Sequence, residues 1–412
     1  MMKARLQSLP YGWRLLLATV ALGIGTGLVG IACHFLLDGV QKLAFGQERS
    51  DLLQQFQEAR GLRRFLVLSV TGLLAAGFWY ILQRRYEILS IRRQIDQVGD
   101  REPAPLAHIL HASMQVAIVG AGASVGKEGA PREVGALLAG RLGKVLSLTI
   151  KEQRVLIACG AGAGLAAVYQ VPFASSLFVF ETLGLSYRWK NVLLVLSSTY
   201  VATWVAQPIV GHGAIYHMSQ VHWSASSFLQ VILVALLVTP LALAFRFLAK
   251  QASRKRRKDW TILWALPLAF MVLAGIVTFY PIFMGNGQVL AQAVLSGQLF
   301  SNLVLVLVVK GLLVYLLLSN GAYGGTLTPS FALGIGSGYL VTMILSAVGL
   351  HLDPALGMLL GATVFLGTTL QAPMTAIALS LGFTGQSWAL ILPLALSAGV
   401  SYVIQNRWEN KR

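Results

Sequence analysis

Gly126-Lys127-Glu128-Gly129-Ala130-Pro131 is the stretch around which this chain is organised. It lies between the apolar runs 114–125 and 134–139, so a lysine and a glutamate stand inside a hydrophobic region. Ionisable residues in such places are costly and are usually functional. Proline suits the first turn of a helix, and glycine lets backbone N–H groups approach a ligand closely. The stretch therefore predicts a helix N-terminus directed at an anion, with Glu128 in the position that the anion would take.

The composition is that of an integral membrane protein. Of the 412 residues, 56% are hydrophobic and only 11% are charged, whereas soluble domains carry about 25% charged residues. A transmembrane helix needs about 20 apolar residues. Many runs here reach that length, and others are shorter and broken by glycine or proline. We therefore expect an all-α membrane protein in which several helices do not span the bilayer fully.

The net charge of +17 follows membrane topology rather than a nucleic-acid footprint. Basic residues cluster at 84–93, at 254–258 and at both termini, whereas the segment 207–224 has neither lysine nor arginine. Cytoplasmic loops of membrane proteins carry such an excess of lysine and arginine. We expect both termini in the cytoplasm and no nucleic-acid partner.

The second half of the chain repeats the first. Three pairs of landmarks recur at nearly one offset: Gly126 and Gly325, Gly135 and Gly334, and Pro172 and Pro373. The loop that follows the first span in one half differs in charge from the corresponding loop in the other half. This difference predicts that the repeats, 1–224 and 225–412, are inverted. Inverted repeats with broken helices place a substrate site near the bilayer midplane, where half-helix N-termini meet.

Three ordered motifs resemble those of the CLC chloride channels and chloride/proton exchangers. They are Gly126-Lys-Glu-Gly129, the glycine-rich run 160–174 followed by Glu181, and Gly324-Gly-Thr-Leu-Thr-Pro-Ser-Phe-Ala-Leu-Gly334. The resemblance extends from the first span to Ile404. It implies a CLC-type inverted repeat with broken and re-entrant helices, a homodimer with one anion pathway per subunit, and no CBS domains.

The resemblance also implies roles for residues of the first and last motifs. Glu128 would be the gate, occupying an outer anion site when charged and moving aside when protonated. Anion-binding residues are expected in both motifs, at Lys127, Gly129, Thr326, Leu327 and Thr328. Structural alternatives stay open, because Glu128 could pair with Lys127 or Arg132, and Lys127 could form an orienting salt bridge with Glu133 or Glu181.

Three positions depart from the family pattern. The Gly-Ser-Gly-Ile-Pro signature falls near 88–92, where only Ser90 remains, and the tyrosine at the start of the last helix falls at Trp388. These departures leave the anion open among chloride, bromide, nitrate and fluoride. Glu181 takes the first internal acidic position, but Thr182 stands where many exchangers have a proton-relaying glutamate. Proton coupling would then depend on Glu181 or water.

Other polar residues in apolar runs have weaker functional interpretations. His108 and His111 lie one helical turn apart, but with no third ligand nearby we expect a helix-surface pair and no metal site. Lys310 stands inside an apolar span, where structural pairing or snorkelling is favoured over an anion contact. Without an ordered nucleophile or metal set, the chain is not expected to be an enzyme or to need a cofactor. The sequence thus predicts transport of a small monovalent anion across a bacterial inner membrane, with proton exchange favoured and a passive channel as the alternative.

Overall fold

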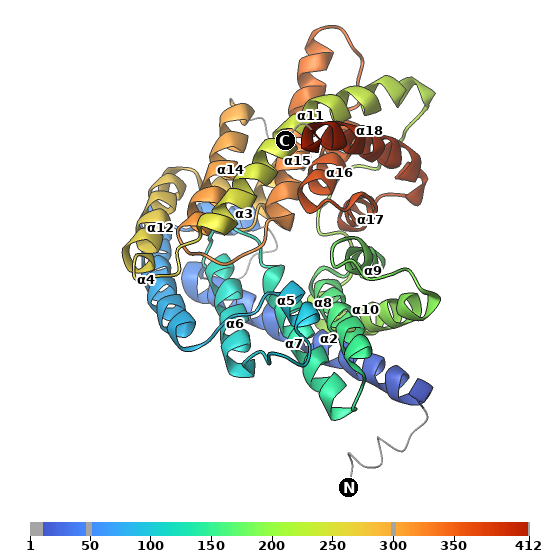
Figure 1. Ribbon diagram of the computed structural model, residues 1–412. Helices are drawn as coiled ribbons and strands as arrows, with labels where there is room; N and C mark the ends of the chain where they lie inside the picture. The colour runs from blue at the N-terminus through green and yellow to red at the C-terminus, as the bar shows by residue number, and fades with distance from the viewer. Residues whose placement is uncertain (1–10, 47–51, 298–301, 411–412) are drawn as a thin grey trace. The chain divides into compact units, whose positions relative to one another are not determined.

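The computed structural model describes residues 11–46, 52–297 and 302–410, and it consists of helices and their connections (Figure 1). The predicted all-α class is confirmed. In chain order the helices are α2 (Tyr11–Phe45), α3 (Leu52–Glu58), α4 (Gly61–Arg85), α5 (Ile91–Asp96), α6 (Pro105–Gly120), α7 (Gly129–Val145), α8 (Ile150–Tyr169), α9 (Pro172–Glu181), α10 (Trp189–Val210), η1 (Ala225–Ser227), α11 (Phe228–Lys255), α12 (Ile262–Phe279), η2 (Pro281–Phe283), α13 (Gln288–Leu295), α14 (Leu303–Ser319), α15 (Leu327–Ala347), α16 (Pro354–Leu370), α17 (Pro373–Thr384), η3 (Trp388–Leu390) and α18 (Ile391–Glu409).

The described chain forms two compact units, each assembled from separate segments. The first unit comprises residues 11–37, 81–116 and 128–213. The second unit comprises the remaining described residues, including 117–127 and everything after 213. The boundary at residue 127 falls inside the motif that carries Glu128, so the first unit holds Glu128 and the second holds Lys127.

Glycine contacts hold together the main helix pair of each unit. In the first unit, a Cβ on Gly135 of α7 would lie 2.9 Å from the carbonyl carbon of Gly160 on α8. In the second unit, a Cβ on Gly334 of α15 would lie 2.7 Å from the carbonyl oxygen of Gly361 on α16. Since Cβ atoms essentially never approach so closely, glycine is required at both contacts. The matched landmarks of the sequence therefore serve the same packing role in each half.

The helix breaks also match between the halves. Helix α8 ends at Gln170 with φ 55° and ψ 35°, and α16 ends at Gln371 with φ 54° and ψ 38°. Left-handed backbone at this point stops a helix. In each case a proline then begins the next helix, Pro172 in α9 and Pro373 in α17, where its missing N–H costs nothing.

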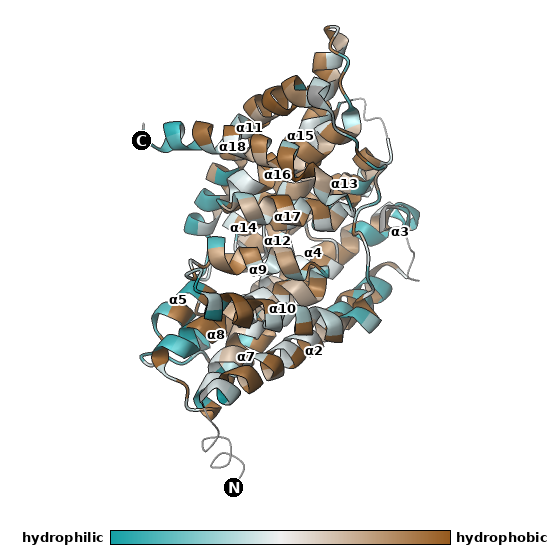
Figure 2. Ribbon diagram, turned by 90° about the vertical axis from the view of Figure 1, so that its right-hand side faces the viewer, coloured by the Kyte–Doolittle hydropathy of each residue, from teal (hydrophilic) through white to brown (hydrophobic). Residues whose placement is uncertain are grey.

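The helix surfaces are those of a membrane protein. Seven helical stretches among the described residues are long and apolar enough to cross a bilayer, namely α2 from Gly12, α4, α10, α11, α12, α15 and Trp388–Glu409. Large apolar side chains are exposed on these helices, including Leu74 (64%), Trp204 (74%) and Phe279 (78%). Figure 2 shows apolar helix surfaces, with hydrophilic residues concentrated in α3 and α5 and at the C-terminal end of α18. This exposed apolar surface suits contact with lipid.

From its polar and charged residues, the segment 41–63 is expected to be a loop that follows a first span ending at Leu37. The structure differs, because helix α2 continues to Phe45 and part of the remaining segment forms the short helix α3.

Lys310 has the structural role that the sequence favoured. Its side chain is completely buried in α14. The ammonium group donates hydrogen bonds to the carbonyl oxygens of Phe283, at 3.1 Å, and Gly285, at 2.8 Å. Lys310 thereby satisfies one carbonyl group at the end of η2 and one in the turn that leads into α13, as buried backbone groups require.

Candidate functional site

Two of the quoted motifs meet through their backbones in the second unit. The N–H of Gly126 donates to the carbonyl of Gly325 at 2.8 Å, and the N–H of Gly325 donates back at 2.7 Å. A Cβ on Gly324 would lie 2.7 Å from Cγ2 of Val125. The pairing therefore depends on the glycines, and it joins stretches that are 199 residues apart in the chain.

The Gly325 side of this pairing leads into the N-terminus of α15. Thr326 is the N-cap residue, and Leu327 and Thr328 are the first two helical residues. Leu327 is 1% exposed and Thr328 is 2% exposed. A helix start presents backbone N–H groups and a partial positive charge, which together favour an anion. The structure thus bears out the helix start, whereas anion binding there remains a prediction.

Glu128 lies two residues beyond Gly126, at the N-terminus of α7. It is the N-cap residue, its side chain is not hydrogen-bonded to the helix as a cap, and it is 1% exposed. The phenol of Tyr169, the last residue of α8, donates to Oε2 of Glu128 at 3.4 Å. Arg132, in the next turn, experiences the charge of Glu128 and lies 4.6 Å from the centre of the Phe178 ring. A buried carboxylate is therefore held at a helix start, in electrostatic range of a cation.

Position 129 has no space for a side chain, because a side chain from α6 packs against it. A Cβ at position 129 would lie 2.5 Å from Oε1 of Gln115. The Gln115 amide is buried, and its nitrogen donates to Oε2 of Glu133 at 3.0 Å. Gln115 therefore joins the residue after Glu128 to a second buried glutamate, one helical turn further along α7.

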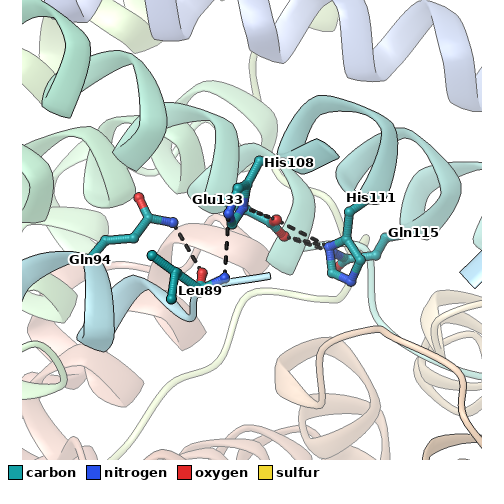
Figure 3. Close-up of polar contacts among 6 residues, drawn as sticks. All are labelled: Leu89, Gln94, His108, His111, Gln115 and Glu133. Atoms are coloured by element: carbon teal, nitrogen blue, oxygen red, sulfur yellow. Dashed lines mark hydrogen bonds and ion pairs between the residues drawn. The ribbon is translucent and has the colours of Figure 1, made fainter. Parts of the chain in front are cut away.

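Glu133 is the centre of a buried polar cluster with His108, His111 and Gln115, which we call the Glu133 cluster (Figure 3). His108 Nδ1 lies 2.6 Å from Oε1 of Glu133, and His111 Nδ1 lies 2.9 Å from Oε2. The two histidines are 0% and 3% exposed. The expectation of a helix-surface pair is therefore wrong, because α7 covers this face of α6 and supplies the carboxylate that the imidazoles need. Among the described residues, no three His, Cys, Asp or Glu side chains are arranged to hold a metal ion.

Three residues with weaker predicted roles are less buried than Glu128. Ser90 is exposed and caps α5 by accepting the N–H of Arg93 at 3.3 Å. Trp388 begins η3 and is 52% exposed. Glu181 is the last residue of α9 and is partly buried. Tyr187 lies in the loop that follows α9, and its ring stacks on a neighbouring ring. Burial and the Glu181 carboxylate raise the pKa of the Tyr187 phenol. Roles in anion or proton binding remain predictions for all three.

Comparison with known proteins now decides the family. The sequence matches the family profile described as voltage gated chloride channel over residues 91–406. The chain belongs to the CLC family. It is 27% identical over 358 residues to a ClcB-like chloride channel protein of Ralstonia nicotianae, covering 82% of each chain. It is 26% identical over 294 residues to the H(+)/Cl(−) exchange transporter ClcA of Vibrio cholerae, covering 68% of this chain and 62% of that protein.

The CLC fold is also shown by structural similarity. A slow cyanobacterial Cl−/H+ antiporter has a TM-score of 0.82 to this chain at 21% identity, with 96% of this chain and 95% of the antiporter covered. The protein is therefore an integral membrane protein of the CLC fold that transports anions, and it is not an enzyme. The relatives include a named channel and a named exchanger, so membership alone does not give the mechanism.

The sequence analysis missed the partners of the buried carboxylates. Tyr169 stands in a quoted motif, but nothing in its spacing indicated that it reaches Glu128. The Glu133 cluster had a partial signal, because His108, His111 and Gln115 recur at helical spacing in an apolar segment. Only the packing of α7 on α6 shows that this face is buried.

Proposed function

We propose that this CLC protein exchanges a small monovalent anion, chloride or a chemically similar ion, for protons, with Glu128 as gate and proton acceptor. The observation that carries the proposal is the Glu128 carboxylate, 1% exposed at the start of α7. A charged carboxylate there competes with an anion for the N–H groups of the helix start, and a protonated one does not. The proposed anion-binding residues belong to the two motifs: Lys127, Gly129, Thr326, Leu327 and Thr328.

The passive channel is the second candidate, and one residue favours it. Thr182 is the C-cap residue of α9, and its hydroxyl does not ionise near neutral pH as a glutamate relay would. The Ralstonia relative is named as a channel, whereas the Vibrio relative is named for exchange. In this second candidate Glu128 gates the anion and carries no proton across, and Glu181 has no transport role.

We further propose a homodimer in a bacterial inner membrane with both termini in the cytoplasm. The bacterial relatives and the basic segments at 84–93 and 254–258 support this placement. We also propose that Ser90 and Trp388 influence which anion is bound, since a hydroxyl and an indole N–H both donate to anions. The matching breaks at Gln170 and Gln371 support the division into repeats 1–224 and 225–412.

The deciding experiment places purified protein in liposomes with opposed anion and proton gradients. If the proposal is right, a chloride gradient drives protons uphill, and Glu128→Gln abolishes that proton movement. Glu58→Gln is the matched control, because Glu58 is an exposed glutamate of α3. Anion movement at its equilibrium potential without any pH change would favour the channel. If bromide, nitrate or fluoride moves and chloride does not, the exchanged anion is one of those.

A further inference from the structure

The Glu133 cluster forms a connected polar path from an exposed segment to the start of α7. At one end, the N–H of Leu89, beside the exposed Ser90, donates to Nε2 of His108 at 3.4 Å. His108 then contacts Glu133, as Figure 3 shows. At the other end, Gln115 contacts Glu133 and packs against Gly129, the residue that follows Glu128. All these residues belong to the first unit.

The hydrogen bonds fix where protons sit at the His108 end. Nε2 of His108 accepts the Leu89 N–H, so Nδ1 carries the ring proton and donates to Oε1 of Glu133 at 2.6 Å. This contact leaves the His108 tautomer defined and the ring neutral, and it uses one oxygen of Glu133.

The His111 end has a place for one exchangeable proton. Nδ1 of His111 lies 2.9 Å and 3.1 Å from the two oxygens of Glu133. Two acceptors at such distances need a proton between them, either on the imidazole or on the carboxyl group. In the singly charged pair this bridging proton is on Nδ1, and a second proton, bound by the carboxyl group or by Nε2 of His111, makes the pair neutral. The amide nitrogen of Gln115 lies 3.0 Å from Nδ1 and 3.0 Å from Oε2 of Glu133, so it contacts both members of the pair.

Burial and hydrogen bonding act in opposite directions on the charge of this cluster. With both histidines neutral, the cluster holds one buried negative charge on Glu133, stabilised by three donors. One added proton makes the cluster neutral overall. Burial favours the neutral form, whereas the donors favour the carboxylate. The ionisable groups that contact Glu133 are His108 and His111 of α6.

The path reaches the neighbourhood of Glu128. Glu128 is the N-cap residue of α7 and Glu133 lies five residues further on, a rise of ~7.5 Å along a helix axis with a rotation of ~140° about it. Proton transfer between the two carboxyl groups would therefore run through bridging water molecules. The Gln115 side chain occupies part of that interval, between Glu133 and Gly129.

We propose that Glu133 and His111 form a proton-binding site that exchanges protons with Glu128. This inference rests on the proposed anion/proton exchange. In the transfer step, one proton leaves the Glu133–His111 pair, which returns to a single negative charge. The Glu128 carboxylate accepts that proton and becomes neutral, so it no longer competes with the anion. No other bond forms or breaks.

The test measures proton and anion movement together in liposomes with a chloride gradient. Glu133→Gln keeps an acceptor for His108 but removes the ionisable carboxyl group. We expect the proton flux to fall at least ~10-fold, as for loss of a group that transfers protons, with anion flux within about twofold of wild type. His111→Gln should give the same uncoupling. Matched controls are Glu58→Gln and His212→Gln, which change exposed residues of the same types.

The outcomes separate this inference from the proposed function. If wild type moves both ions and Glu133→Gln keeps the wild-type ratio of protons to anions, the Glu133 site is refuted while exchange stands. If wild type moves anions without protons, exchange and the Glu133 site are both refuted. If Glu133→Gln moves no anion, the ratio measured for His111→Gln decides, because a merely structural role would lower both fluxes without changing their ratio.

Discussion

Gly164→Ala tests whether close packing of α8 on α7 sets the position of Glu128. A Cβ at position 164 would lie 2.6 Å from the carbonyl carbon of Pro131 and nearer still to its oxygen. Ordinary carbon–carbon contacts are about 3.5–4.0 Å, so the helices would have to separate by about 1 Å. Overpacking of this kind costs ~1–3 kcal/mol, and the better helix propensity of alanine offsets up to ~1 kcal/mol of it. We therefore expect a net loss of ~1–2 kcal/mol.

The assay is thermal unfolding of the detergent-purified protein, followed by anion flux per folded molecule. Each kcal/mol shifts Tm by ~2–4 °C in domains of 150–250 residues, so Gly164→Ala should lower Tm by ~2–8 °C. Flux should also fall, because Pro131 lies in the first turn of α7 after Glu128. Gly140→Ala is the matched control, since its Cβ would meet Ile157 at an ordinary 3.8 Å. Equal Tm and flux in the two variants would refute the packing argument.

Three further predictions follow from single contacts. Tyr169→Phe removes a donor to the Glu128 carboxylate; the anion flux measured across pH should differ from that of wild type, and an unchanged profile would contradict the contact. Gly324→Ala should reduce anion flux strongly by disrupting the paired backbone at the site, and wild-type flux would show that the pairing is dispensable. The hydrogen bond from Lys144 lowers the pKa of Glu102, so its stabilisation is present above the unfolded pKa and is lost as pH falls through the folded pKa. Glu102→Gln should therefore lower Tm slightly at neutral pH and leave it unchanged in acid, whereas an equal loss at both pH values would contradict the linkage.

The sequence predicted those features that depend on local chemistry. The prolines at 172 and 373 indicated the breaks at 170–172 and 371–373, because proline suits the first turn of a new helix. The equal offsets also indicated that Gly126 and Gly325 are equivalent, and the structure pairs them. These inferences needed only residue type and spacing.

The rest of the site depended on packing that no local pattern contains. His108 and His111 share a helix face, but the sequence does not show that α7 covers it. Glu133 is a charged residue in the first turns of a helix, a common position for an exposed carboxylate. Its burial follows from its contacts with His108, His111 and Gln115 of α6. The Glu133 cluster could therefore be recognised only after the helices were assembled.

The pH dependence of anion flux in Glu128→Gln tests the central claim most directly. Glutamine has the size of a protonated glutamate and cannot ionise, so the variant should hold the gate in its open form. We predict that chloride flux in liposomes becomes independent of pH in Glu128→Gln, while wild type and Glu58→Gln keep a pH-dependent flux. If Glu128→Gln retains the wild-type pH profile, another group controls the anion pathway and Glu128 is not the gate.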